Sequence, residues 1–359
     1  MNNSRNILIC FIMTTLFVLY GCTAYTDNTE TESQEGCMNE KENIQNVFLK
    51  FLEEVSVTES SVIFPDSITG EPLEIMKNPE RTVVLFPSLT ALWYEAGGSA
   101  IGCIGGNAAE SVYTEQIGRN IAEDAGMQTV ALSSAGKQWD VEKIIALKPN
   151  LIICSDSMNG YAVISEAAKN AGIPVICADY DDFADYLKWY YIFCLLNGKP
   201  QLWEETALPV LNQVTEILTT IPNGESPRVF SLFTGSGTMQ ANTSRTVIGE
   251  MLQLMNAENI ADVNKNSMAE RIECNLEAVY AEDPDIILIQ CHADTDISRR
   301  KVENLYGKNP VWLSLRAVQS GRVYYLDKSL FHNKPNRRYA EAYRVLAELL
   351  YPEWKYTEK

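Results

Sequence analysis

Histidine is scarce in this sequence, which contains only His292 and His332 among its 359 residues. A protein site for a bare zinc or manganese ion usually combines several histidines and carboxylates at close spacing. The sequence therefore predicts no metal site built from protein residues alone. It also lacks the GxSxG, HExxH, Walker-loop and dinucleotide-binding motifs of common enzymes. We expect a protein without enzymatic activity.

Positive charge is also in short supply, because 29 Lys and Arg residues stand against 47 Asp and Glu residues, giving a net charge of −18. No basic stripe interrupts this excess, so an anionic polymer would be repelled and no nucleic-acid partner is expected. The remaining composition, with 46% hydrophobic and 21% charged residues, is typical of a globular protein. The length is sufficient for two lobes of about 150 residues each.

The nine cysteines include no CxxC pair. Cys154, Cys177 and Cys291 end short apolar runs, where a small buried thiol is the usual interpretation. A single disulfide that involves Cys37 or Cys274 is an open alternative, because spacing alone does not select a pairing.

The first 21 residues have the order of a secretory signal peptide, in which one basic residue, Arg5, precedes an apolar run over residues 7–20. This run is shorter than a comfortable membrane-spanning helix. It is followed by Gly21 and Cys22, which resemble the end of the bacterial lipobox, although Tyr20 is bulkier than that pattern usually carries. The resemblance implies that Cys22 is lipidated and begins the mature chain. A plain signal peptide and an uncleaved anchor are the alternatives.

Residues 22–39 are rich in Thr, Glu, Ser, Asn and Gln, with too few apolar groups to offset the chain entropy lost on folding. We interpret them as a disordered tether. Residues 40–55 then carry apolar side chains at helical spacing, which predicts an amphipathic helical extension over residues 40–63. We expect this extension to pack on the body of the protein, and a partner-binding helix is the alternative.

From residue 79 onward, short β-branched runs alternate with helical patterns, as they do in parallel βα units. Residues 181–221 interrupt this alternation because they are mostly helical in pattern. The second helical piece, of about 18 residues, would span roughly 27 Å, which is enough to cross from one lobe to another. The sequence therefore predicts a helix that links two groups of βα units.

The two groups of βα units contain similar segments in the same order. Residues 227–233 are similar to 79–85, and residues 275–288 are similar to 140–153. This repetition favours an α/β fold of two Rossmann-like βα lobes joined by a long helix, with a ligand cleft between the lobes. The expected segments are a signal peptide (1–21), a tether (22–39), the helical extension (40–63), an N-terminal lobe (64–200), a linking helix (201–222) and a C-terminal lobe (223–359).

In this order the motifs resemble those of the helix-linked (class III) solute-binding proteins of ABC importers, a family that includes vitamin B12, ferric siderophore and haem binders. The resemblance covers about residues 64–352. It implies a lipid-anchored protein on the extracytoplasmic face of the bacterial cell membrane, with an ABC permease and its ATPase subunits as partners. The segments that carry it are 78–84, 87–90, 141–153, 171–175, 312–318, 321–324 and 349–353.

In that family one glutamate on each lobe docks into arginine pockets of the permease, and the matching residues here are Glu142 and Glu277. A structural explanation exists beside this one. Asp140 and Asn275 are natural N-caps, and a glutamate two residues later complements the dipole of a helix N-terminus.

The ligand is expected between the lobes, in loops at the carboxyl ends of the strands. Aromatic residues there would stack on a flat or chelated ligand, arginines would hold its anionic groups, and one member of the polar run 331–339 would reach the cleft. The alternatives are core packing for the aromatics and surface pairing for the arginines. The candidates are Tyr113, Trp139, Tyr161, Arg245, Arg271, His332 and Arg338.

Two further possibilities concern the histidines: either one is an axial haem ligand, or His292 forms a small site with Asp294 and Asp296. The resemblance implies a receptor that captures a ferric siderophore or another iron complex and delivers it to the permease, with no cofactor of its own. Corrinoid or haem binding within the same family is the alternative ligand class. A lipoprotein that senses or scavenges a ligand without transport is the alternative role.

Overall fold

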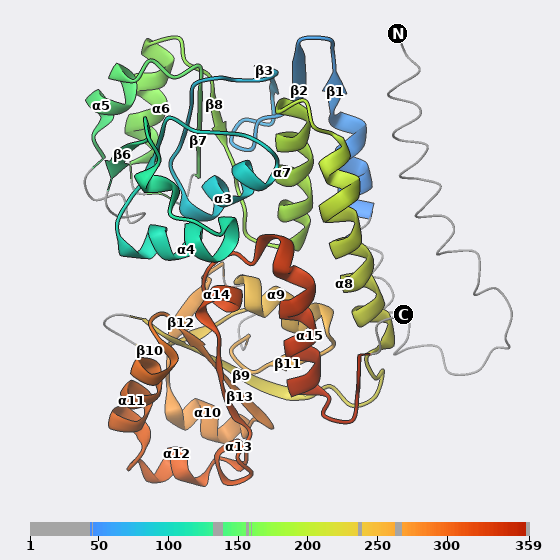
Figure 1. Cartoon of the computed structure of the whole chain (residues 1–359). Helices are drawn as coiled ribbons and strands as arrows, with labels where there is room; N and C mark the ends of the chain where they lie inside the picture. Colours follow the sequence, from blue (N-terminus) through green and yellow to red (C-terminus); the bar gives the residue numbers. More distant parts are fainter. Residues whose placement is uncertain are drawn as a thin grey trace, which may run out of the picture.

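The computed structural model describes residues 44, 46–131, 139–155, 158, 160–235, 239–262 and 268–356, which form two α/β lobes joined by long helices (Figure 1). This arrangement confirms the predicted fold class. The expected signal peptide, the expected tether and Cys22 lie outside the described residues. Across the part of the chain that is described, no helix has the length and apolar character needed to cross a membrane.

The helical extension packs on the body of the protein through its apolar stripe. Residues 46–54 are helical, and the ring of Phe48 stacks on Trp203 with a centroid distance of 4.8 Å. Ile44, Phe48 and Leu52, at helical spacing, are all buried. The apolar stripe of this helix is therefore buried against the core of the described part of the chain, as expected for an extension that packs on the body of the protein.

The prediction of a helical extension as far as residue 63 is wrong beyond residue 54. There the chain forms β1 (Ser56–Val57) and β2 (Ser61–Pro65), which pair antiparallel, and β3 (Pro72–Met76) adds a third strand. The side-chain oxygen of Thr58 accepts hydrogen bonds from the backbone amides of Ser60 and Ser61. This local bonding stabilises a turn in place of a further helical turn.

The N-terminal lobe is built on a parallel sheet with the strand order β6-β5-β4-β7-β8. Its central strands are short runs of β-branched and other apolar residues that are completely buried, as expected where helices cover both faces of a sheet. The elements are β4 (Thr82–Val84), α3 (Pro87–Glu95), β5 (Gly102–Ile104), α4 (Asn107–Ile117), η1 (Ile121–Glu123), β6 (Gln128–Ala131), α5 (Val141–Ala146), β7 (Leu151–Cys154), α6 (Tyr161–Asn170) and β8 (Val175–Cys177).

The C-terminal lobe has the strand order β12-β10-β9-β13-β14, with the short β11 paired to β9. Strands β9, β13 and β14 are parallel, whereas β10 and β12 run antiparallel to their neighbours. The elements are β9 (Arg228–Thr234), β10 (Met239–Asn242), α9 (Val247–Leu254), β11 (Glu258–Asn259), β12 (Arg271–Glu273), α10 (Leu276–Glu282), β13 (Ile286–Cys291), α11 (Thr295–Tyr306), α12 (Pro310–Ser314), α13 (Arg316–Gln319), β14 (Val323–Leu326), α14 (Lys328–Phe331), η3 (Asn336–Arg338) and α15 (Tyr339–Leu350).

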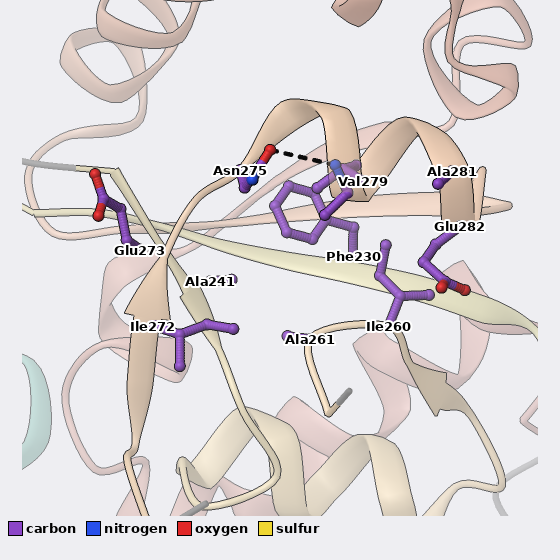
Figure 2. A pocket seen from close by; sticks show the side chains of 11 residues that line it. Phe230, Ala241, Ile260, Ala261, Ile272, Glu273, Asn275, Val279, Ala281 and Glu282 are labelled. Atoms are coloured by element: carbon purple, nitrogen blue, oxygen red, sulfur yellow. Dashed lines mark hydrogen bonds between the residues drawn. The ribbon is translucent and has the colours of Figure 1, made fainter. Parts of the chain in front are cut away.

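Helix α10 encloses an apolar cavity of about 250 Å³ against the sheet of this lobe (Figure 2). Phe230 from β9 and Val279 from α10 both line it, and Ile260 and Ile272 add further apolar surface. The cavity lies inside the C-terminal lobe and takes all its lining residues from that lobe.

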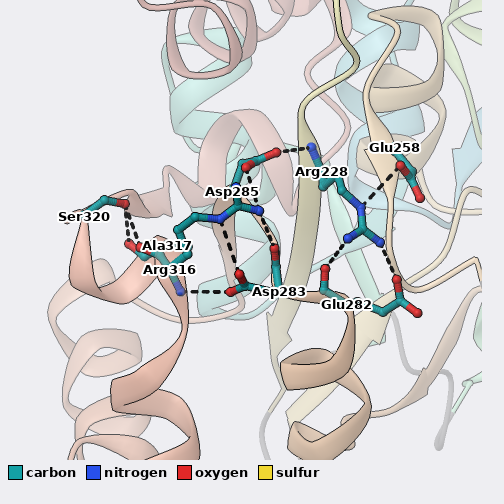
Figure 3. A network of polar contacts seen from close by, with 8 residues as sticks. All are labelled: Arg228, Glu258, Glu282, Asp283, Asp285, Arg316, Ala317 and Ser320. Atoms are coloured by element: carbon teal, nitrogen blue, oxygen red, sulfur yellow. Dashed lines mark hydrogen bonds and ion pairs between the residues drawn. The ribbon is translucent and has the colours of Figure 1, made fainter.

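The predicted similarity between the two halves of the chain appears in the structure as matching hydrogen bonds. In the N-terminal lobe the side chain of Asn150 accepts a hydrogen bond from the backbone amide of Arg81 at 3.1 Å. In the C-terminal lobe the side chain of Asp285 accepts one from the backbone amide of Arg228 at 2.9 Å (Figure 3). Each bond ties the beginning of one strand, at Arg81 just before β4 or at Arg228 in β9, to the residue that precedes the parallel neighbour, β7 or β13. Both lobes are therefore assembled around the same pair of neighbouring strands.

The lobes are joined by α7 (Phe183–Leu196) and by a second helical stretch over residues 201–220 that ends in α8 (Leu208–Thr220). At the start of this second stretch, Trp203–Ala207 form a π-helical segment that ends two residues before Pro209. A proline has no amide hydrogen and crowds the carbonyl four residues earlier, so a widened turn at this point relieves the clash. Helix α15 packs along α8 (Figure 1), and one apolar core runs from β7 of the first lobe through these helices to β13 of the second.

The lobes also meet through the residues that precede α15. Asn336 from the C-terminal side is completely buried and bonds three groups of the N-terminal lobe. Its side-chain nitrogen donates to the carbonyl of Ser88 at 3.1 Å and to the side chain of Gln116 at 2.6 Å, and its oxygen accepts from the Tyr180 hydroxyl at 2.9 Å. These contacts hold the lobes together independently of any ligand.

Two continuous features thus connect the lobes, a shared apolar core and a buried polar contact, and we predict only a modest closure on ligand binding. Small-angle scattering with and without a bound ligand measures this closure. A small decrease in the radius of gyration is expected. A large compaction contradicts the prediction.

A buried carboxyl group at the same boundary makes stability depend on pH. Glu95, at the end of α3, is only 8% exposed in its side chain, and its Oε1 lies 3.4 Å from Nε of Arg337. Neither carboxylate oxygen accepts a hydrogen bond from a described residue. Burial raises the pKa of Glu95 to about 7, and Arg337 offsets only part of this rise.

We therefore predict that Glu95→Gln flattens the pH dependence of unfolding. Between about pH 4.5 and pH 7 the unfolded chain has lost the Glu95 proton while the folded protein still holds it, so stability falls as the pH rises through this window. Glutamine removes this loss, and the free energy of unfolding at pH 8 should rise by roughly 1 to 3 kcal/mol. Urea unfolding from pH 5 to pH 8 measures the effect, with the exposed Glu166→Gln as control. The prediction is contradicted if the free energy of unfolding has the same pH dependence in the wild-type protein, Glu95→Gln and Glu166→Gln.

The six described cysteines carry free thiols, and all but Cys274 are buried. The burial predicted for Cys154, Cys177 and Cys291 is confirmed. Burial raises the pKa of Cys103 to about 11 and that of Cys194 to about 12. These thiols are therefore protonated at neutral pH.

Candidate functional site

A polar cavity of about 130 Å³ lies at the carboxyl edge of the C-terminal sheet, where the loop after β8 meets that lobe. The position agrees with the expectation that the ligand lies in loops at strand ends between the lobes. It is lined by Asp181, Arg245, Thr246, Val247, Glu270, Arg271, Gln290, Phe331, His332, Asn333 and Lys334.

Arg271 is held in place by its neighbours in the sheet. It is the first residue of β12, and its Nε donates to the side-chain oxygen of Asn242 at 3.0 Å. Its guanidinium carbon lies 4.3 Å from the centroid of the Phe233 ring, at the end of β9. Burial lowers the pKa of Arg271, but an arginine remains charged in proteins. The cavity therefore has a fixed, partly desolvated positive charge.

The only two histidines of the chain meet at this edge. His292 directly follows β13 and His332 directly follows α14, and Nδ1 of His292 lies 3.0 Å from Nε2 of His332. The ring of His332 stacks on Phe233 with a centroid distance of 5.6 Å. Burial, with the nearby cations, lowers the pKa of His332 to about 4 and also lowers the pKa of His292. Both imidazoles are therefore neutral near pH 7, and one donates a hydrogen to the other.

Three buried polar atoms on lining residues have no hydrogen-bond partner among the described residues: Oε1 of Gln290, Nδ1 of His332 and Nδ2 of Asn333. Buried polar groups are normally satisfied by protein or by ordered water. Their concentration at one cavity indicates a place where a polar ligand or water completes the bonding.

The balance of charge around the cavity favours an anionic ligand. Lys334 pairs with Asp181 at 3.4 Å, and Arg271 pairs with Glu270 at 3.6 Å. Arg245 is exposed and forms no ion pair with a described residue. One positive charge is therefore left over for an anionic group such as a carboxylate.

The structure thus brings together three of the predicted ligand-binding residues, Arg245, Arg271 and His332. It separates Arg338 from them. The Arg338 guanidinium forms two bonds with the carboxylate of Glu341, at 2.7 and 2.9 Å, and lines a different hollow beside α8. Contrary to its assignment as a ligand-binding residue, Arg338 does not line this cavity, because its charge is neutralised by Glu341 in the first turn of α15.

Tyr113 is also misassigned as a ligand platform. It lies in α4, its ring is completely buried against β5, and its hydroxyl donates to the carbonyl of Ile104 at 2.7 Å. The alternative of core packing is therefore correct for this residue. In α4 it continues the buried stripe formed with Ala109, Val112 and Gln116.

Trp139 and Tyr161 lie at the carboxyl edge of the N-terminal sheet, outside the lining of the polar cavity. Both are half-buried and pack on the same apolar cluster. Gly160 allows this packing, because a side-chain carbon at that position would lie 2.6 Å from Cδ1 of Trp139. Burial raises the pKa of Tyr161 to about 12, so its hydroxyl is a hydrogen-bond donor at neutral pH.

Glu142 and Glu277 occupy equivalent positions in the first turns of α5 and α10. The predicted N-caps are confirmed, since Asp140 accepts from the Lys143 amide at 2.9 Å and Asn275 accepts from the Glu277 amide at 3.0 Å. Both glutamates are exposed, and neither pairs with a basic residue in the described parts of the chain. Their carboxylates are available to a partner.

The sequence did not identify Phe233 and Gln290 as parts of the site. Phe233 and Gln290 are each the last residue but one of a strand. Their position at the carboxyl end of a predicted strand was the signal in the sequence that could have identified them. The apolar cavity under α10 is larger, but its walls offer few polar groups and it does not reach the lobe boundary.

Comparison with known proteins agrees with this architecture. The family described as "Periplasmic binding protein" matches residues 83–330. The uncharacterized ABC transporter substrate-binding lipoprotein YvrC of Bacillus subtilis is 26% identical over 301 residues, which cover 81% of this chain and 87% of that protein. The Fe(3+)-citrate-binding protein YfmC of the same organism is 24% identical over 70% of this chain and 74% of its own.

Among solved structures, Staphylococcus aureus IsdE complexed with heme has a TM-score of 0.60 at 19% identity, covering 75% of this chain and 98% of that one. This similarity supports the two-lobed fold. The match to the family extends over both lobes and the helices between them. The chain therefore belongs to the periplasmic binding protein family, as the order of its motifs predicts.

Proposed function

We propose that this protein is the membrane-anchored solute-binding component of an ABC importer, and that it captures an iron complex with anionic groups, such as a ferric siderophore, for delivery to the permease. The observation that carries the ligand assignment is the polar cavity at the lobe boundary. There Arg245 and Arg271 stand beside three buried polar atoms without partners. The names of the Bacillus relatives, a substrate-binding lipoprotein and an Fe(3+)-citrate-binding protein, support the transport role and the iron ligand.

The cavity is small relative to a whole siderophore, so it serves as the anchor for one arm of the ligand. A volume of about 130 Å³ accommodates a carboxylate or hydroxamate arm. Arginine binds such groups through two parallel hydrogen bonds, which fixes their orientation. A bulky neutral ligand would leave the excess positive charge without a partner.

A ligand panel tests this proposal. The full-length protein in mild detergent is heated alone and with ferric citrate, ferric hydroxamate and catecholate siderophores, haem or cobalamin. A ligand at about 100 times its dissociation constant stabilises the folded protein by roughly 2.7 kcal/mol, which raises the melting temperature by several degrees. We expect a shift with an iron complex. A shift with haem or cobalamin alone replaces the ligand class, and no shift with any compound contradicts the binding role.

The membrane anchor is tested by the lipid itself. Cells that express the protein are labelled with radioactive palmitate, and the wild-type chain should carry the label. Cys22→Ala removes the thiol to which the lipid would be attached and should abolish labelling. Cys37→Ala is the matched control and should leave it intact. A labelled Cys22→Ala protein contradicts the anchor assignment.

A further inference from the structure

We propose that His292 and His332 both coordinate one transition-metal ion, which arrives already bound to an open-chain chelator. The two imidazoles would occupy two adjacent coordination positions that the chelator leaves free. This inference rests on the proposed function and narrows it to one class of metal complex. The ligand class it names is a chelate that leaves two neighbouring positions free.

The two imidazoles are brought together by long-range contacts. They are 40 residues apart in the chain, yet both leave the carboxyl edge of the C-terminal lobe, one after β13 and one after α14. The segments that lead to them are tied to each other, because the side chain of Gln290, two residues before His292, donates to the carbonyl of Phe331, directly before His332. The position of each ring is therefore set by the fold.

A single aromatic ring orients both imidazoles. Phe233 stacks on His332 at an interplanar angle of 25° and meets His292 edge-on at 77°, with centroid distances of 5.6 and 5.8 Å. The two imidazole planes stand 80° apart. A pair held in this way loses little freedom when it binds a ligand, which is the property of a prepared site.

The separation of the two nitrogens matches one coordination geometry. Metal to imidazole bonds are about 2.0 to 2.1 Å long, so two nitrogens at a right angle around one ion lie roughly 2.8 to 3.0 Å apart. Nitrogens on opposite sides of the ion lie about 4.0 to 4.2 Å apart. The observed distance of 3.0 Å between Nδ1 of His292 and Nε2 of His332 fits adjacent positions and not opposite ones.

This geometry distinguishes between the ligand classes. A porphyrin or corrin ring fills the four positions in its plane and leaves only the two opposite ones. Two imidazoles on one side of such a ring cannot both reach the metal. An open-chain chelator with four donor atoms leaves two neighbouring positions of an octahedral ion free, and His292 and His332 match that vacancy.

The surroundings supply the rest of the recognition. Among the described residues, no three His, Cys, Asp or Glu side chains gather to hold a metal, so the pair cannot complete a site for a bare ion. His332 lines the polar cavity with Arg245 and Arg271, which would hold the anionic arms of the chelator. In the unliganded protein one of the two facing nitrogens donates a hydrogen to the other. When both bind the ion, this hydrogen would move to the far nitrogen of the donor ring.

The experiment compares two chelates of the same ion. Nickel(II) nitrilotriacetate leaves two adjacent positions open, whereas nickel(II) ethylenediaminetetraacetate leaves none. Untagged full-length protein has no other histidine, so background binding is low. We expect calorimetry to show binding of the nitrilotriacetate complex at least about tenfold tighter than the control complex. His292→Ala and His332→Phe should each lose this preference, and the phenylalanine preserves the stack on Phe233.

A spectroscopic readout separates coordination from packing. With copper(II) nitrilotriacetate, electron paramagnetic resonance of the bound complex should show coupling to two imidazole nitrogens, reduced to one in either variant. Equal binding of the two chelates, unchanged binding by the variants, or a spectrum without imidazole coupling overturns this inference. If ferric siderophores bind while these probes fail, the proposed function stands and the two-histidine site falls. If the probes bind through the histidines while no iron complex binds, the two-histidine site stands and the proposed iron-complex ligand is wrong.

Discussion

Asn336→Ala is expected to destabilise the protein by about 3 kcal/mol or more, which lowers the melting temperature by roughly 4 to 5 °C or more in a chain of this size. The substitution removes three hydrogen bonds at once and leaves the Tyr180 hydroxyl, the Ser88 carbonyl and the Gln116 side chain buried without that partner. Each unsatisfied buried group costs about 1 to 3 kcal/mol. Differential scanning calorimetry measures the change.

A matched control separates the side chain from the backbone. Asn336 has a left-handed conformation with φ of 50°, which alanine tolerates less well than asparagine. Asn256 has nearly the same backbone, with φ of 57°, but its side-chain contact with Ser226 is exposed. Asn256→Ala therefore reports the backbone cost together with one exposed hydrogen bond, and we expect the total to be at most about 1 kcal/mol. Equal losses for the two variants would mean that the buried hydrogen bonds contribute little.

The double variant Glu142→Gln and Glu277→Gln is expected to reduce uptake of the ligand by at least about tenfold while its binding affinity stays unchanged. Both carboxylates are exposed, lie at equivalent positions on the two lobes and face no basic partner among the described residues. Loss of a paired charge at a protein interface commonly costs about 2 to 5 kcal/mol. Uptake of the radiolabelled iron complex by whole cells measures the effect, beside calorimetry on the purified variant.

The control for this variant replaces two other exposed glutamates, Glu166 in α6 and Glu303 in α11, with glutamine. It alters the net charge by the same amount and should leave uptake normal. Normal uptake in the variant with Glu142→Gln and Glu277→Gln would contradict the assignment of these two glutamates as docking residues. A simultaneous loss of ligand binding would instead mean that the glutamates act on the fold.

The order of strands and helices was predictable because each is encoded locally. Short β-branched runs and apolar stripes at helical spacing set β4, β7, α3 and the helix at 46–54. The repetition of Asn150 and Asp285 before their strands predicted two related lobes, and the matching amide bonds from Arg81 and Arg228 explain why those residues recur. The antiparallel strands β10 and β12 were not predictable in this way, because strand direction depends on pairing across distant parts of the chain.

The errors in the candidate site have different causes. Arg338 has a glutamate three positions later in a helix, and Tyr113 lies on a stripe with Ala109 and Val112, so both signals were present in the sequence. The meeting of His292 and His332 had no local signal. It depends on the contact between β13 and α14, which only the folded chain reveals.

The buried thiols have a practical consequence for measuring opening of the structure. Cys103, Cys154, Cys177 and Cys194 lie in the N-terminal lobe and its helices, and Cys291 lies in the C-terminal lobe. A thiol without solvent access does not react with an alkylating reagent. The rate at which iodoacetamide modifies each cysteine therefore reports how often that part of the chain becomes exposed. Peptide mass spectrometry then reads the opening of each lobe separately, in the unlabelled wild-type protein.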